Sequence, residues 1–155
     1  MIISFVISGL VIILDQLTKF LIYGTPARSV LGNLLWFESS LNTGVAFSMF
    51  EGKSYIFIIT SLIASLIFIY LIVSKKVFST KFEVFTLGAI LGGTLSNVID
   101  RFIFGGVRDF IYLKFINFAI FNVADMAITI GAILLCVAVL ISIIKTEKKE
   151  NKWLN

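Results

Sequence analysis

Four long apolar runs constrain this chain more than any other feature. They cover residues 1–23, 54–74, 82–104 and 123–144, and each is close to the ~20 residues that a helix needs to cross the hydrocarbon layer of a membrane. Apolar residues make up 59% of the chain, more than the roughly 45–50% that is usual in soluble domains. We therefore expect an all-α membrane protein built as a bundle of four transmembrane helices.

The residues outside these runs are too few for a second domain. They form an external segment at 24–53, two short connections and a tail, so we expect residues 1–155 to be a single integral membrane domain. The first run starts without basic residues and is interrupted by Asp15 and Lys19. We expect it to stay in the protein as a span and not to be removed as a signal peptide.

Two segments outside the spans have patterns of their own. Glycine and proline punctuate the external segment around residues 30–38, which are rich in leucine and aromatic residues; this pattern predicts a short extracytoplasmic β-sheet on the membrane surface. Residues 111–121, with their aromatic side chains, predict a short interfacial segment. Gly105 and Gly106 predict the end of the third helix and a turn that carries Asp109.

The lysines indicate how the bundle is oriented. Basic residues are in excess in cytoplasmic loops, and seven lysines lie on one predicted side: Lys75, Lys76, Lys81, Lys145, Lys148, Lys149 and Lys152. The opposite side carries five basic residues, so the bias is modest: Arg28, Lys53, Arg101, Arg108 and Lys114. We expect both termini to be cytoplasmic. The net charge of +4 then acts at the membrane surface, and no nucleic-acid partner is expected.

Polar and charged residues gather at the other ends of the spans. In a four-span bundle, the ends of the first and third helices share one face with the starts of the second and fourth. The residues brought to this face are Asp15, Lys19, Asn42, Asn97, Asp100, Arg101, Asp109, Asn122 and Asp125. An ionisable group near lipid costs roughly 2.5–3.5 kcal/mol and is rarely there without a task. We therefore expect a functional site near the outer leaflet.

Each of these residues also has a structural interpretation. Asp15 and Lys19, spaced i,i+4, are typical of an ion pair whose lysine snorkels to the interface. Asp100 beside Arg101 is typical of a boundary ion pair, and Asn122 of an N-cap for a helix that has Asp125 in its first turn. A buried Asn97 can hold a neighbouring carboxylate by a hydrogen bond. The convergence of all these residues on one face favours a site.

Small residues recur every four positions in the third span. Gly88, Gly92 and Ser96 form a stripe that lets another helix approach closely. This stripe predicts helix packing and does not itself indicate a site.

The chain contains no histidine, which narrows the chemistry. A metalloprotease of the H-E-x-x-H type needs histidine, as do Ser–His and Cys–His nucleophile pairs. Two carboxyls within a few ångströms cannot both ionise, so one can activate water while the other donates a proton to a carbonyl oxygen. Asp109 and Asp125 are the candidates for such a pair. No metal and no cofactor are expected.

Five segments in order resemble the motif set of the bacterial lipoprotein signal peptidases, also called signal peptidase II. They run from Asp15 to Lys19 (DQLTK), Asn42 to Phe47 (NTGVAF), Gly92 to Arg101 (GGTLSNVIDR), Val107 to Phe110 (VRDF) and Phe121 to Asp125 (FNVAD). The resemblance covers nearly the whole chain. It implies an aspartyl protease of the bacterial plasma membrane that cuts the signal peptide from a prolipoprotein, just before a cysteine that bears diacylglycerol.

The resemblance also implies roles for single residues. Asp109 and Asp125 match the catalytic dyad, and Asp15, with Lys19 in the same motif, matches a supporting position. Seven residues match positions that line or brace the site: Asn42, Gly44, Asn97, Asp100, Arg101, Asn122 and Ala124. Two residues depart from the family pattern. Ser96 replaces a usual glycine, and Arg108 replaces a usual apolar residue, where it could perturb the ionisation of Asp109 or bind lipid phosphate.

Other classes of protein remain open at this point. A small transporter or assembly factor could use intramembrane charges as a polar pathway, and a structural subunit could carry them without a reaction. The protease interpretation implies lipid-modified prolipoproteins and membrane lipids as partners of a monomer. Its substrate would enter sideways from the bilayer, with the external sheet as a cradle and residues 111–121 as a lid.

Overall fold

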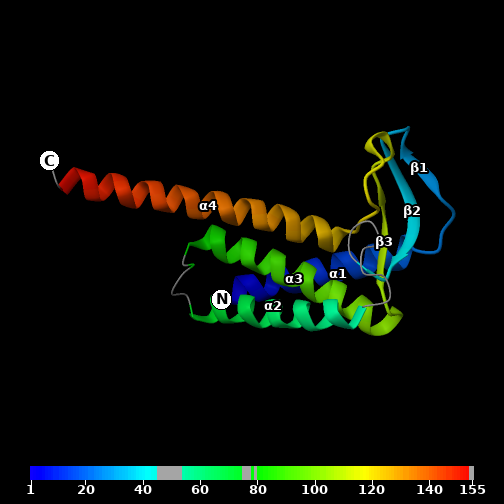
Figure 1. The fold of residues 1–155 in the computed structure, drawn as a ribbon, viewed down its shortest axis with the longest axis horizontal. Helices are drawn as coiled ribbons and strands as arrows, with labels where there is room; N and C mark the ends of the chain where they lie inside the picture. Colours follow the sequence, from blue (N-terminus) through cyan, green and yellow to red (C-terminus); the bar gives the residue numbers. More distant parts are fainter. Residues whose placement is uncertain (45–53, 75–77, 79, 154–155) are drawn as a thin grey trace.

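The structure is a computed structural model that describes residues 1–44, 54–74, 78 and 80–153. Within this part of the chain, four long helices run roughly along one axis (Figure 1): α1 (Ile2–Ile22), α2 (Ser54–Ser74), α3 (Lys81–Phe104) and α4 (Val123–Trp153). Each contains a stretch long and apolar enough to cross a membrane. The predicted bundle of four spans is confirmed.

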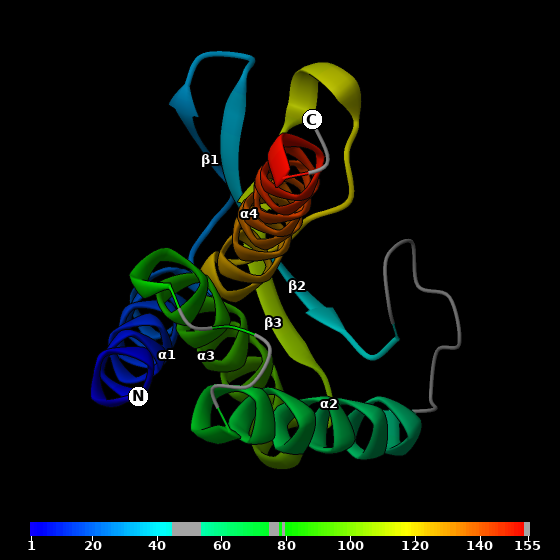
Figure 2. The ribbon, with the colours of Figure 1, turned by 90° about the vertical axis from the view of Figure 1, so that its left-hand side faces the viewer.

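Helix α3 is the centre of the bundle. It packs against α1, α2 and α4, and Figure 2 shows the other helices arranged around it. In α3, 72% of the most apolar stretch is buried by protein, against 17% or less in each of the other three helices. The outer faces of α1, α2 and α4 are therefore the lipid-facing surfaces, and α3 is the helix that can carry polar groups away from lipid.

Small residues allow α1 to lie directly on α3. A Cβ atom added to Gly88 would be 2.5 Å from the Ser4 carbonyl oxygen, and one added to Gly92 would be 2.6 Å from the Ser8 carbonyl oxygen. Both distances are too short for a side chain. The predicted small-residue stripe on α3 is thus the contact with α1.

A three-stranded antiparallel sheet lies across one end of the bundle (Figure 1). It is formed by β1 (Arg28–Leu31), β2 (Leu35–Asn42) and β3 (Val107–Tyr112), in the order β1-β2-β3. The predicted short β-sheet is confirmed, and the N-terminus and the described end of α4 lie at the opposite end of the bundle.

The sheet differs from the prediction in its third strand. The turn expected around Asp109 is instead strand β3, in which Asp109 pairs with Ser40 of β2. A strand forms here because β2 would otherwise present an unpaired edge of backbone N–H and C=O groups. Of the interfacial segment predicted at 111–121, the first two residues belong to β3, and a 3₁₀ turn, η2 (Lys114–Ile116), follows.

Helix α4 continues beyond the predicted span. The apolar run ends at residue 144, but the helix extends to Trp153, where a tail was expected. Lysine and glutamate dominate this extension in the sequence, and both are good helix formers. Residues 45–47 of the second motif, and Lys75 and Lys76, lie outside the described residues.

Candidate active site

Asp109 is held on β3 by two side-chain amides from other elements. Asn42, at the end of β2, donates from Nδ2 to Asp109 Oδ2 at 3.1 Å. Asn122, just before α4, donates from Nδ2 to Asp109 Oδ1 at 2.6 Å. The Gly44 N–H donates to Asn42 Oδ1 at 3.1 Å, which fixes the orientation of the Asn42 amide. Asp109 is thus a buried carboxyl with a donor on each oxygen.

Asp125 lies in the first turn of α4, where Asn122 is the N-cap. The Asp125 N–H donates to Asn122 Oδ1 at 2.9 Å, and the Asn122 N–H donates to Asp125 Oδ2 at 3.2 Å. This reciprocal pair is a capping box. Asn97 of α3 donates from Nδ2 to Asp125 Oδ1 at 2.8 Å. The capping and carboxylate-holding interpretations of Asn122, Asp125 and Asn97 are therefore both correct.

The two carboxyls line the same cavity of about 280 Å³. Its wall also includes Asn42, Asn97 and Arg101, and residues 118–121 close another side. Burial raises the pKa of Asp109 to about 7, with a further increase from the negative charge of Asp125, while hydrogen bonds from Asn42 and Asn122 oppose the shift. Asp109 can therefore hold a proton at neutral pH beside a second carboxyl.

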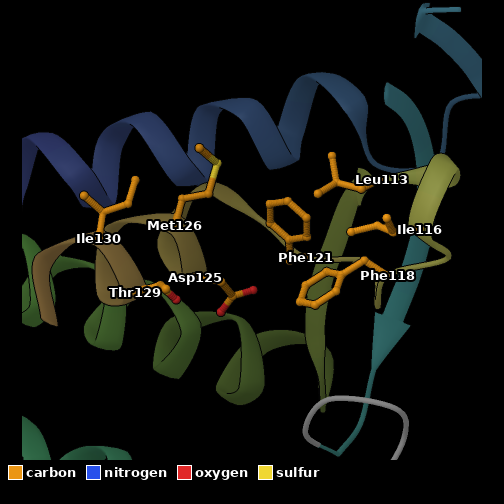
Figure 3. A pocket seen from close by; sticks show the side chains of 8 residues that line it. All are labelled: Leu113, Ile116, Phe118, Phe121, Asp125, Met126, Thr129 and Ile130. Carbon is orange, nitrogen blue, oxygen red and sulfur yellow. The ribbon is translucent and has the colours of Figure 1, made fainter. Parts of the chain in front are cut away.

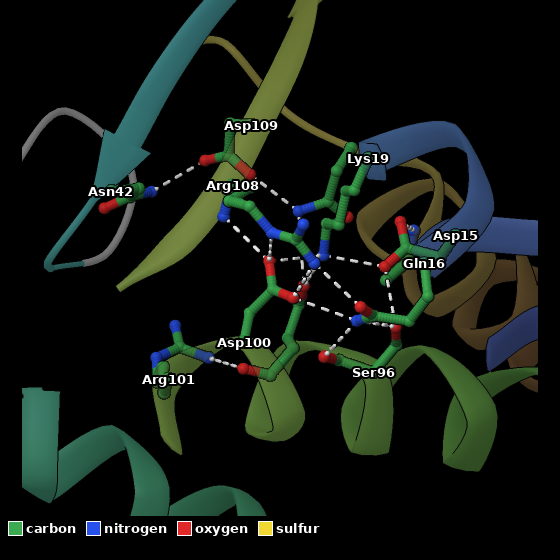
Figure 4. Close-up of polar contacts among 12 residues, drawn as sticks. Asp15, Gln16, Lys19, Asn42, Ser96, Asp100, Arg101, Arg108 and Asp109 are labelled. Carbon is green, nitrogen blue, oxygen red and sulfur yellow. Dashed lines mark hydrogen bonds and ion pairs between the residues drawn. The ribbon is translucent and has the colours of Figure 1, made fainter. Parts of the chain in front are cut away.

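Lys19 is completely buried behind this pair (Figure 4). Its Nζ donates to Asp15 Oδ2 at 2.7 Å, to Asp100 Oδ2 at 3.2 Å and to Asn97 Oδ1 at 3.0 Å. An ammonium has three N–H groups, so each has an acceptor. The pairing of Lys19 with Asp15 is confirmed, but the prediction that Lys19 snorkels to the interface is wrong, because these acceptors hold the ammonium inside the bundle.

Asp15 connects three helices. Besides Lys19 of its own helix, it accepts a hydrogen bond from Ser96 Oγ of α3 at 2.7 Å and one from the Ala124 N–H of α4 at 2.8 Å. Ala124 is fully buried, and Gly93 of α3 lies so close to it that a Cβ atom there would be 2.5 Å from the Ala124 carbonyl oxygen. Asp15 therefore fixes the start of α4, which carries Asp125.

Asp100 and Arg101 are adjacent but do different things. Asp100 forms its described ion pairs with Lys19 and Arg108, so the predicted boundary pair with Arg101 is wrong. The two side chains leave α3 in different directions, since adjacent residues of a helix are about 100° apart. Arg101 donates from Nη1 to the Asn97 carbonyl oxygen at 3.4 Å, stacks over Phe57 of α2 and lines the cavity.

The two departures from the expected pattern are both part of this polar cluster. Ser96 holds Asp15, as described above, and Arg108 pairs with Asp100, with its guanidinium directed away from the surface. A guanidinium buried in this way does not serve as a lipid-phosphate site. The main causes of the raised pKa of Asp109 are burial and the negative charge of Asp125.

Gln16 was not predicted as a site residue. It donates from Nε2 to Ser96 Oγ at 3.0 Å and to Asp100 Oδ1 at 2.9 Å, and its Oε1 accepts from Arg108 Nη2 at 2.7 Å. The sequence contained a signal, because an amide between Asp15 and Lys19 in an apolar span needs partners as they do.

Two apolar cavities border the same place. One, of about 300 Å³, lies between residues 113–121 and α4, with Asp125 at its edge and Leu113, Phe121 and Met126 among its walls (Figure 3). Another, of about 610 Å³, lies between α2 and α4 with α3 as its floor, and reaches Asn97, Arg101 and Asp125. The described residues contain no group of three or more His, Cys, Asp or Glu side chains that could hold a metal ion.

The chain is similar to known proteins of one family. The sequence profile of the signal peptidase (SPase) II family matches residues 7–141. The chain is 33% identical to the lipoprotein signal peptidase of Enterococcus faecalis, over 98% of this chain and 95% of that protein. It is 39% identical to that of Geobacillus kaustophilus, over 84% and 88%.

Solved structures give the same result. A bacterial membrane enzyme determined by the in meso method superposes with a TM-score of 0.81, at 33% identity over 88% of this chain and 87% of that chain. Another superposes with a TM-score of 0.79, at 34% identity over 88% and 92%.

Proposed function

Because the chain belongs to the signal peptidase II family, we propose that it is an aspartic endopeptidase that removes the signal peptide from diacylglyceryl-modified prolipoproteins by cutting before the lipidated cysteine. The family makes the chain a membrane protease that acts on lipoprotein signal peptides. The aspartic mechanism, the position of the cut and the residue roles are the proposed part. One observation carries them: two carboxyls, Asp109 and Asp125, line one cavity and are held by three asparagines, Asn42, Asn97 and Asn122.

In the proposed reaction, Asp109 and Asp125 share one proton. The ionised carboxyl, Asp125, accepts a proton from a water molecule, whose oxygen attacks the carbonyl carbon of the scissile peptide. The protonated carboxyl, Asp109, donates its proton to the carbonyl oxygen. When the tetrahedral intermediate collapses, Asp125 gives a proton to the leaving nitrogen, the C–N bond breaks, and Asp109 recovers a proton from the carbonyl-derived hydroxyl.

The pKa of about 7 supports a shared proton, because it lets Asp109 hold a proton at neutral pH beside the second carboxyl. The surrounding residues then act by position. Asn42 and Asn122 orient Asp109. Asn97 and the N-terminus of α4 orient Asp125. The cluster of Asp15, Lys19 and Asp100 supports these amides. Arg101, a cation on the cavity wall, balances the negative charge of the pair.

The apolar cavities suit a substrate that arrives from the bilayer. The larger cavity, between α2 and α4, reaches Asp125 from the side, and the smaller one offers apolar surface beside the same residue. Acyl chains can stay near lipid while the peptide meets the carboxyls. In this proposal the protein is a monomer in the bacterial plasma membrane, with membrane lipids around it, its termini cytoplasmic and its site at the outer face.

The test is cleavage of a diacylglyceryl-modified peptide by purified protein. Asp109→Asn and Asp125→Asn should each lose most of the rate, at least the ~10²–10⁴ typical of general acid–base catalysis, because asparagine keeps the shape but exchanges no proton. Glu38→Gln, on β2 of the same sheet, is the matched control and should cleave normally. Thermal unfolding checks that each variant is folded. Wild-type turnover in either aspartate variant would exclude the dyad.

A further inference from the structure

Arg108 donates three hydrogen bonds to one carboxylate. Its Nη2 donates to Asp100 Oδ1 at 2.8 Å, its Nε to Asp100 Oδ2 at 3.3 Å, and its main-chain N–H to the same Oδ2 at 2.9 Å. Nη2 also donates to Gln16 Oε1, and the guanidinium stacks 4.1 Å from the centre of the Phe104 ring. Such a two-pronged contact is the strong form of the Arg–carboxylate pair.

This contact sets the charge balance behind the two candidate catalytic residues. The buried cluster contains two acids, Asp15 and Asp100, and two bases, Lys19 and Arg108. Without Arg108, the cluster would contain one cationic side chain, Lys19, for two carboxylates. Asp100 would keep Lys19 and Gln16 as its side-chain partners, and a buried carboxylate with fewer partners attracts the remaining cation more strongly.

Lys19 also has a second task. It donates to Asn97 Oδ1, and Asn97 in turn donates from Nδ2 to Asp125. A Lys19 drawn toward Asp100 would leave Asn97, and Asn97 is the only α3 side chain among the described contacts that holds Asp125. The Asn97 amide therefore connects the ionic cluster to the candidate catalytic carboxyl, in addition to the contact between Asp15 and the Ala124 N–H at the start of α4.

We infer that Arg108 is a positioning residue: by neutralising Asp100 it leaves Lys19 free to hold Asn97 and so Asp125, and through its own N–H it anchors β3 beside Asp109. This inference rests on the proposed function. Arg108 and Asp109 are consecutive in a strand, so their side chains point to opposite faces. One face of β3 thus carries Arg108, and the opposite face carries Asp109.

The planar shape of the guanidinium is important here, and not only its charge. Arginine presents a rigid planar fork, whereas lysine presents a compact point charge with a different reach. A lysine at position 108 would keep the charge balance of the cluster but could not make the same paired contacts with Asp100 and Gln16. The two properties can therefore be separated by two substitutions.

The experiment compares steady-state cleavage of a diacylglyceryl-modified peptide by wild type, Arg108→Met and Arg108→Lys. Arg108→Met should lower kcat about 10–100-fold, as loss of a supporting partner commonly does. KM should stay within about threefold, since Arg108 does not line the cavity. The kcat of Arg108→Lys should lie between that of Arg108→Met and that of wild type. Lys81→Met is the control: Lys81 is exposed at the start of α3, the end of that helix away from the sheet, and its loss should leave both constants unchanged.

Rates are expressed per folded molecule, so that a purely structural role would lower the melting temperature and leave kcat unchanged. A kcat for Arg108→Met within about twofold of wild type, or Arg108→Lys no better than Arg108→Met, overturns the inference. If Arg108→Met does not fold, Arg108→Lys decides: reduced kcat at unchanged KM supports the inference, and unchanged kcat overturns it. A wild-type protein that cleaves nothing contradicts the proposed function itself, whereas an active wild type with indifferent Arg108 variants contradicts only this inference.

Discussion

Lys19 shows what single residues contribute to this site. A lysine without exposed surface is costly unless its charge is paired and its donors are satisfied, and here Asp15, Asp100 and Asn97 supply one acceptor for each N–H. The i,i+4 spacing predicted the contact with Asp15. The contacts with α3 could not be predicted, because they depend on how closely α1 approaches α3.

The pH dependence of stability follows from Asp109. Its pKa is raised from 3.8 to about 7, so folding favours the protonated form. The folded state therefore loses stability as the pH rises from about 4 to about 7, and the full loss is present above that range. Asp109→Asn removes this titration.

We expect the melting temperature of Asp109→Asn to rise relative to wild type between about pH 5 and about pH 8. A constant difference between Asp109→Asn and wild type across this range would contradict the raised pKa.

Neighbouring residues on α3 should differ sharply in their effect on activity. Ser96→Gly removes one donor to Asp15, which keeps Lys19 and the Ala124 N–H. We expect activity within a few fold of wild type and a loss of about 1 kcal/mol of stability. Asn97→Ala removes the contacts to both Asp125 and Lys19, and a misplaced catalytic group costs about 10²-fold. Prolipoprotein processing measures both variants, and equally mild effects would mean that α3 is only a scaffold.

At the scale of elements, the sequence analysis was accurate for the helices and incomplete for the sheet. Apolar runs determine where helices cross lipid, so the four spans agree with the structure to within a residue or two at most ends. Strand β3 was missed because its partner, β2, lies far away in the sequence, and a single short strand has no hairpin signal of its own. The extension of α4 was missed because hydropathy predicts which residues cross the membrane, and a helix can continue beyond them into water.

Glycines of α3 should be essential where another helix touches them. A Cβ at Gly93 would lie 2.5 Å from the Ala124 carbonyl oxygen, whereas a Cβ at Gly9 of α1 would meet nothing within 4 Å. We expect Gly93→Ala to displace the start of α4 and lower both the melting temperature and the cleavage rate. Gly9→Ala is the matched control and should be neutral or stabilising by up to about 1 kcal/mol. Equal behaviour of the two variants would contradict the close contact between α3 and α4.

At the scale of the whole molecule, polar residues far apart in the sequence gather at one end of the bundle. The position of the cluster was predictable, because alternate span ends must share a face. The contacts within the cluster were not predictable. Arg108 pairs with Asp100 and Gln16, and this contact depends on β3 folding back over α3. The N-terminus and the described end of α4 lie at the other end of the bundle (Figure 1).

This arrangement predicts which sites are accessible from outside the cell. In a background with Cys136→Ala, a cysteine at Asn33, in the exposed β1–β2 hairpin, should react with a membrane-impermeant maleimide on intact cells. A cysteine at Phe78, between α2 and α3, should react only after the cells are opened. Labelling of position 78 from outside would reverse the orientation of the protein and place the site in the cytoplasm.

The three amides around the carboxyl pair have a further consequence, for the chemical ageing of the protein. Asn42, Asn97 and Asn122 together hold Asp109 and Asp125, and asparagine is among the thermolabile side chains. Hydrolysis of any one of these amides would release ammonia and leave a third carboxylate against the pair. Under the proposed mechanism, a single such event would stop cleavage in a molecule that is still folded and still embedded in lipid. The working lifetime of the protein therefore depends on how well its fold protects three amide bonds from water.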